Sequence, residues 1–202
     1  MDRTVTDRTV TVAGSATLAV APDCAHLNCG VQVEGTNAQD ALRRSNEAMR
    51  AIVDALTAGG VAPADLRTNG PNLWPSERGY HGSNDVAVVV RDIDALGGVI
   101  DAVAAAGGPN LTMHGVSFSL ADPSEHLPAV RRAAVGAAHA TATELADAAG
   151  AAVGEVLTIA ESPGFAAPVA VRAAAFSKGT PVQAGSQELR VDVTVTYRLV
   201  DR

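Results

Sequence analysis

Residues 72–90 (NLWPSERGYHGSNDVAVVV) hold a group of side chains that could bind a ligand or move a proton. The candidate contact residues are Trp74, Glu77, Tyr80 and His81. Aromatic rings stack on flat groups, and a histidine beside a carboxylate is suited to acid–base chemistry. The same stretch also fits a hairpin connection, because Pro75 and Gly79 bracket its polar centre. The sequence favours the hairpin, with a contact surface as its function.

A catalytic site in this stretch is not favoured. His81 and Asp85 share one face of an expected strand, but four residues of extended chain span about 13 Å, too far for direct proton transfer. Ser83 would add a nucleophile on the same face, yet nothing singles out these three residues. The chain contains no G-x-S-x-G, H-E-x-x-H, C-x-x-C or glycine-rich phosphate loop. We therefore predict no catalytic residues and no enzyme.

The two cysteines are not expected to pair with each other. Cys24 and Cys29 fall in one expected strand, so they point to opposite faces about 16 Å apart. Cys29 is predicted to lie in the core. Cys24 shares the polar face with His26 and Asn28, which resembles half of a metal site, but without further ligands nearby we interpret it as strand surface. We predict no metal and no cofactor.

Composition and charge limit the class of protein and its partners. Hydrophobic residues make up 47% of the 202 residues and charged residues 18%, which is typical of a globular chain. A net charge of -7 argues against nucleic acid and anionic membranes as partners. No apolar run reaches the roughly 18 residues that a membrane span needs, and the N-terminus lacks a secretory signal. We expect a cytoplasmic protein, or a cell-envelope protein if a leader has been removed.

Hydrophobic periodicity predicts an α+β fold in the order β-β-α-β-β-α-β-α-β-β. The expected strands are 10–20, 24–34, 66–74, 80–90, 111–120, 156–162 and 189–199, and the expected helices begin at Thr36, Asp92 and Asp122. Residues 24–120 follow the ferredoxin-like β-α-β-β-α-β order, to which a long helix and flanking antiparallel strands are added. We predict a single domain over 1–202, with an extended arm at 1–8 and a long mobile loop at 163–185.

Several short motifs, in order along the chain, resemble the SIMPL-domain family. They are Gly14-Ser15-Ala16, Ala21-Pro22-Asp23 in a first hairpin, Asn46-Glu47-Ala48-Met49, Leu66-Arg67-Thr68-Asn69-Gly70, Gly79-Tyr80, Gly115 to Leu120, Asp122-Pro123 and Val153-Gly154. The resemblance implies an α+β protein without an established catalytic site. It also implies kinship with bacterial envelope proteins that are tied to oxidative-stress defence and can form oligomers.

Two functions follow from these observations. The first is a non-enzymatic oligomerising or scaffold protein that uses exposed strands and the 163–185 loop as contact surfaces, because unpaired strand edges favour association. It would form a homo-oligomer and could also bind another protein. The alternative is a small-ligand or peptide-binding module with a pocket near Trp74 and Tyr80, under the 163–185 loop.

Overall fold

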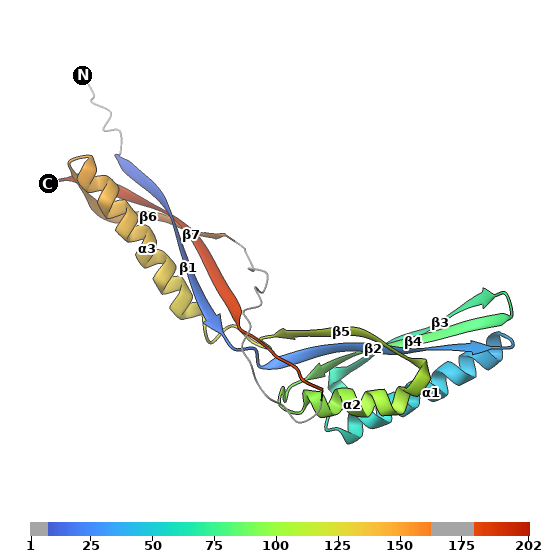
Figure 1. Cartoon of the computed structure of the whole chain (residues 1–202). Helices are drawn as coiled ribbons and strands as arrows, with labels where there is room; N and C mark the ends of the chain where they lie inside the picture. Colours follow the sequence, from blue (N-terminus) through green and yellow to red (C-terminus); the bar gives the residue numbers. More distant parts are fainter. Residues whose placement is uncertain (1–7, 163–179) are drawn as a thin grey trace. The chain divides into compact units, whose positions relative to one another are not determined.

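The computed structural model describes residues 8–162 and 180–202 of the chain (Figure 1). The strands are β1 (Thr9–Val20), β2 (Cys24–Gly35), β3 (Leu66–Ser76), β4 (Gly79–Val90), β5 (Leu111–Ser119), β6 (Ala151–Ser162) and β7 (Gln187–Asp201). The helices are α1 (Ala38–Ala58), α2 (Leu96–Gly107) and α3 (Leu127–Ala148), with short 3-10 turns at Pro63–Asp65 and Gly108–Asn110. The predicted α+β class and element order are confirmed.

These elements form two compact units. Unit 1 contains β1, α3, β6 and β7, whereas unit 2 contains β2 to β5, α1, α2 and residues 180–186. Apart from residues 180–186, the described part of unit 2 is therefore an insertion in the sequence between β1 and α3. The single domain over 1–202 stays a prediction. The predicted arm at 1–8 and loop at 163–185 lie outside the described residues, apart from residue 8 and residues 180–185.

Unit 2 has the predicted ferredoxin-like topology. Its antiparallel sheet has the order β3-β4-β2-β5, and α1 and α2 cover one face of it (Figure 1). Alternate residues of β4 face these helices, so Val86, Val88 and Val90 are buried while their neighbours point to the open face. The core is aliphatic, as the composition predicts. It includes Leu27, Cys29, Val31, Met49, Ile52, Leu56, Leu96, Val99 and Val103.

β3 is irregular near its middle. Its register against β4 shifts between Thr68 and Pro71, where Gly70 has a φ of 80°. This bulge lies on an edge strand, where a proline removes no hydrogen bond from a neighbour. β3 and β4 then form the expected hairpin, with a two-residue turn between Ser76 and Gly79.

Unit 1 is a three-stranded antiparallel sheet with the order β1-β7-β6, and α3 packs on one face (Figure 1). The last strand, predicted at 189–199, alternates between buried and more exposed residues, and the residues facing α3 are buried. They are Val191, Val193, Val195 and Tyr197. α3 contributes a stripe at every fourth position: Val130, Ala134, Ala138, Ala142 and Ala146.

Small side chains allow α3 to approach β1 closely. A Cβ atom added at Gly14 would clash with the carbonyl oxygen of Ala134 and would lie 2.6 Å from the backbone nitrogen of Ala138. These contacts involve helix backbone, so no side-chain rotation relieves them. Gly14 and the alanine stripe therefore set the distance between helix and sheet.

Several expectations were wrong in detail. β1 and β2 do not form a hairpin, because β1 pairs with β7 and β2 pairs with β4 and β5. α1 is capped by Asn37, whose side chain accepts the N–H of Asp40, and not by Thr36. α3 starts at Leu127, five residues later than the expected Asp122, so Pro128 occupies its first turn, where proline is tolerated.

In the last half of α3, Ala142 and Ala146 face the sheet and are buried, whereas Thr141 and Leu145 are exposed. Leucine is the more hydrophobic residue, yet only alanine fits where helix and sheet approach this closely. β6 begins at Ala151, five residues earlier than predicted.

Replacing Gly14 by alanine should destabilise unit 1 by about 1–3 kcal/mol, because the added methyl group overpacks against helix backbone. Gly136→Ala in α3 is the matched control, since a Cβ there meets nothing within 4 Å. It should stabilise the helix by up to about 1 kcal/mol. Urea unfolding followed by far-ultraviolet circular dichroism measures both changes. Equal stability of Gly14→Ala and the unsubstituted protein would contradict the close approach.

Candidate functional site

The β3–β4 hairpin carries all four predicted contact residues. Trp74 lies opposite His81, and their rings stack with centroids 5.6 Å apart at an interplanar angle of 29°. His81 also lies opposite Glu34 of β2, with its Nδ1 3.9 Å from Oε1 of that residue. The open face of the sheet thus has a tryptophan, a histidine and a carboxylate in one row across three strands.

The other two predicted residues lie elsewhere on the hairpin. Tyr80 is next to His81 in β4, so its side chain points to the opposite face of the sheet. Glu77 lies in the exposed turn between the strands. The structure therefore brings together Trp74 and His81, but neither Tyr80 nor Glu77 joins them. The role of these four residues as a contact surface stays a prediction.

The open face of unit 2 holds a second histidine–carboxylate pair, which sequence reasoning missed. A bulge between β2 and β5, where Gly115 has a φ of 128°, turns His114 to the open face. Its Nε2 lies 3.1 Å from Oδ1 of Asp85. The Asp85 carboxylate lies over Gly30, where a Cβ would clash with it.

The expected separation of His81 and Asp85 along β4 holds, because each finds its partner on a different strand. Glu34 of β2 lies near His81, and His114 of β5 bonds to Asp85. No spacing rule within one strand could have shown these pairs. They result from strand register, which brings together residues far apart in the sequence.

Cys24 has surroundings that the sequence did not suggest. It was expected on the strand surface, but it is only 2% exposed. Its Sγ lies 3.2 Å from the backbone oxygen of Ser119, to which it donates, and 3.1 Å from Oγ of Ser119. The same hydroxyl lies 2.7 Å from Nε2 of His26. Ser119 of β5 therefore bridges a thiol and an imidazole on β2.

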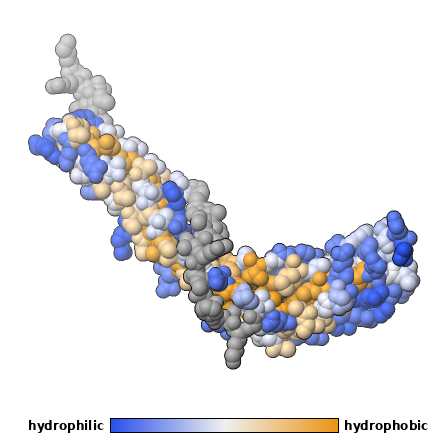
Figure 2. Space-filling view, in the orientation of Figure 1, coloured by the Kyte–Doolittle hydropathy of each residue, from blue (hydrophilic) through white to orange (hydrophobic). Residues whose placement is uncertain are grey.

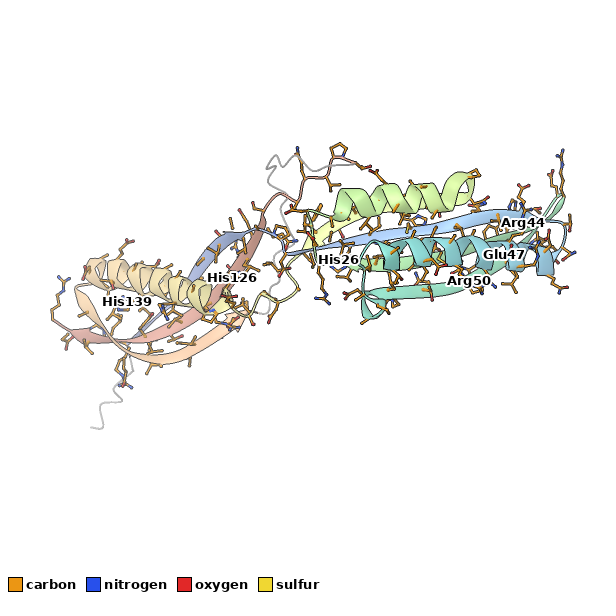
Figure 3. The ribbon with its side chains drawn as sticks, turned by 90° about the horizontal axis from the view of Figure 1, so that it is seen from below. His26, Arg44, Glu47, Arg50, His126 and His139 are labelled. Carbon is orange, nitrogen blue, oxygen red and sulfur yellow. The ribbon has the colours of Figure 1, made fainter. Side chains whose placement is uncertain are left out.

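A shallow groove of about 520 Å³ runs over the open face beside this cluster. Its lining includes His26 and Asn28 of β2, Ser117 of β5 and Arg67 of β3. Figure 3 shows His26 at one end of unit 2, on β2. The His26 imidazole is thus both hydrogen-bonded to Ser119 and in contact with open space.

The remaining histidines and the charged helix face have ordinary structural roles. His126 and His139 belong to unit 1 (Figure 3), where the His139 ring packs edge-on against Tyr197 at 5.7 Å. α1 presents a charged face to solvent, and its exposed residues include Arg43, Arg44, Glu47, Arg50 and Asp54. Hydrogen bonds from Arg43 hold the pKa of Asp40 below its usual value.

Within residues 8–162 and 180–202, no three residues of the types His, Cys, Asp and Glu gather as a metal cluster. None of the helices in these ranges has the length and hydropathy needed to cross a membrane. Both cysteines are free thiols. Cys29 lies fully buried in the core, as predicted, and burial followed by the charge of Asp85 raises the pKa of its thiol to about 11.

These features define an α+β protein in which a ferredoxin-like unit with a polar open face is inserted into a helix-covered, three-stranded sheet. The sequence model of the SIMPL family, described as "Protein of unknown function (DUF541)", matches residues 10–197. The chain belongs to this family, as the motifs of the sequence indicate. The match runs across both units.

Two curated relatives show where related chains occur. The chain is 30% identical to the "26 kDa periplasmic immunogenic protein" of Brucella melitensis, over 94% of this chain and 84% of that protein. It is 25% identical to "Uncharacterized protein YggE" of Escherichia coli K12, over 68% of this chain and 59% of that protein. Neither name describes an enzyme. The first relative is periplasmic, so the predicted cytoplasmic location gains no support from it.

Among solved structures, a protein of unknown function from Galdieria sulphuraria is similar over 87% of this chain and 83% of its own, at 10% identity. The TM-score is 0.29. A score this low carries no argument about fold or function.

The buried thiol of Cys29 should make stability fall at alkaline pH. Its pKa is 9.0 in an unfolded chain and about 11 in the fold, so above pH 9 the unfolded state loses a proton that the folded state retains. The free energy of unfolding should fall by up to about 2–3 kcal/mol between pH 9 and 11. Urea unfolding at several pH values measures this. The Cys29→Val protein should lose this part of the slope, and an unchanged slope would refute the assignment.

Proposed function

We propose that this chain is a non-enzymatic protein that assembles with copies of itself and acts as a scaffold. The free edges of the unit 1 sheet carry this proposal. β1 and β6 each contain 12 residues and each pair only with β7, so each leaves one side without a neighbouring strand in the described residues. Neither strand contains proline. Such edges are templates for pairing with another chain.

The contrast with unit 2 strengthens this inference. Its edge strands carry the usual protection, because β3 contains Pro71, Pro75 and a bulge, and β5 is shorter and bulged at Gly115. β1 (TVTVAGSATLAV) has neither proline nor a charged residue, and its register against β7 is regular throughout. β6 is less regular, with register shifts against β7 between Val153 and Thr158, so β1 is the more available edge of the unit 1 sheet.

Exposed apolar side chains accompany these edges. On β6, Val156 is 48% exposed and Ile159 is 54% exposed, although both are strongly hydrophobic. The outer surface of α3 is also weakly charged, and Figure 2 shows pale and orange surface along unit 1. The exposed small residues of α3 include Ala133, Gly136, Ala137 and Ala140. Association would remove such surface from water.

The setting proposed for this assembly is the bacterial cell envelope, in oxidative-stress defence. A relative at 30% identity is named a periplasmic protein, which supports the location. Family resemblance alone supports the link to oxidative stress. Neither depends on a particular residue of this chain.

A second candidate, peptide or small-ligand binding, has one observation in its favour. A groove of about 550 Å³ is lined by Glu34, Arg44 and His81, and the His81 ring stacks on that of Trp74. It lies where β2 extends beyond Leu111, the first residue of β5, so that the end of β2 lacks a partner on that side. Tyr80 points to the other face, which distinguishes this groove from the pocket predicted from the sequence.

Self-assembly predicts a particle mass several times the 20.4 kDa of one chain. Size-exclusion chromatography with multi-angle light scattering measures it across a range of concentrations. A strictly monomeric protein at high concentration would refute the scaffold proposal.

The free edge of β1 can be blocked without breaking the hydrogen bonds between β1 and β7. Leu199 donates its N–H to the carbonyl oxygen of Arg8, so even-numbered residues of β1 bond to β7 and odd-numbered ones present their backbone outward. Ala13→Pro removes an outward N–H and adds a ring that obstructs a neighbouring strand. If β1 is the contact edge, this change should lower the particle mass at least severalfold.

Ala13→Thr is the matched control, because it enlarges the same side chain but keeps the N–H. It should retain the assembled mass. Circular dichroism must show that both variants are folded. A folded Ala13→Pro protein with unchanged mass would exclude β1 as the contact edge and leave β6 as the candidate.

A further inference from the structure

We propose that Cys24, His26 and Ser119 form a binding site for a soft monovalent metal ion, specifically Cu⁺. The thiol Sγ of Cys24 and the imidazole Nε2 of His26 converge on one atom, Oγ of Ser119, at 3.1 Å and 2.7 Å. The sequence suggested a cysteine–histidine pair without a third ligand. β5 supplies that third ligand, from 95 positions further along the chain.

The site is held by rigid elements. β2 is an interior strand of its sheet, and the register places Cys24 opposite Ser119 and His26 opposite Ser117. Bonds from metal to sulfur and nitrogen are about 2.3 and 2.0 Å. An ion that keeps Ser119 Oγ as its weak third ligand would lie between Sγ, Nε2 and Oγ, and side-chain rotations would bring the three atoms to bonding distance.

The ligand set favours a soft ion of low coordination number. Thiolate and imidazole are ligands that Cu⁺ prefers, whereas structural zinc takes four protein ligands, most often Cys and His. Among the residues that the structure describes, a serine hydroxyl is the one third group seen at hydrogen-bond distance from both. Two strong ligands and a weak one suit Cu⁺ better than Zn²⁺.

The charge of the site also favours a monovalent ion. A thiolate and a monovalent ion together are neutral, so little charge is buried at a cysteine that is 2% exposed.

Binding of Cu⁺ releases one proton, from the thiol of Cys24. The Cys24 thiol, which donates to the backbone oxygen of Ser119, loses its proton to solvent as the metal–sulfur bond forms. His26 binds as the neutral imidazole through Nε2. The groove lined by His26 and Ser117 gives a path from solvent to that nitrogen.

Anaerobic titration of the whole protein with Cu⁺, in competition with bathocuproine disulfonate, tests the site. One ion per chain should be retained, with a thiolate-to-metal absorption band in the near ultraviolet. Cys24→Ser should weaken binding by more than about 100-fold and His26→Gln by at least about tenfold, because losing a ligand costs more than the 10–100-fold typical of outer-sphere partners.

Cys29→Val is the matched control, since that thiol lies on the opposite face, and it should bind Cu⁺ like the unsubstituted protein. X-ray absorption of the unsubstituted complex should show one sulfur and at least one imidazole ligand, a readout that does not depend on variants folding. No retention of Cu⁺, unchanged binding by folded Cys24→Ser, loss in Cys29→Val alone, or tighter binding of Zn²⁺ would each overturn the proposal.

Discussion

The antiparallel ladder between β1 and β7 is the constraint on which unit 1 depends. It joins positions as distant as Thr11 and Thr196, whose hydroxyls are hydrogen-bonded although they are 185 residues apart in sequence. Closing a flexible loop of that length costs about 5 kcal/mol of chain entropy. The buried side of β7, from Val191 to Tyr197, offsets this cost, since each buried aliphatic side chain contributes roughly 1.5–3 kcal/mol. A folded unit 2 would shorten the effective loop that must close.

The hydrophobic pattern of the sequence predicted those elements well in which buried and exposed residues alternate strictly. β4 and β7 have one face on a helix and one face open, so their sequences alternate and the strands are found within a residue or two. The partner of β1 could not be found this way. Its alternation of Val10, Val12 and Ala16 with polar residues fits either sheet, and only the three-dimensional structure shows that it pairs with β7 and not with β2.

The candidate sites were harder to predict, because their partners come from other strands. The pairing of His114 with Asp85 was hard to predict because it depends on two glycines. Gly115 permits a bulge that turns His114 to the open face, and Gly30 leaves room for the Asp85 carboxylate. Cys24 is another case. Its burial and its contact with Ser119 depend on which residue of β5 lies opposite, and a one-residue change of register would separate them.

The assembly surface and the metal site rest on different parts of the chain. β1 and β6 belong to unit 1, whereas Cys24, His26 and Ser119 belong to unit 2 and lie on a sheet whose edges are protected by proline or bulges. A change that blocks the edge of β1 leaves all three ligands and their register intact. Loss of the thiol, in turn, removes no backbone group from the free edges. Either property can therefore be present without the other, and the chain needs no conformational coupling between its units to have both.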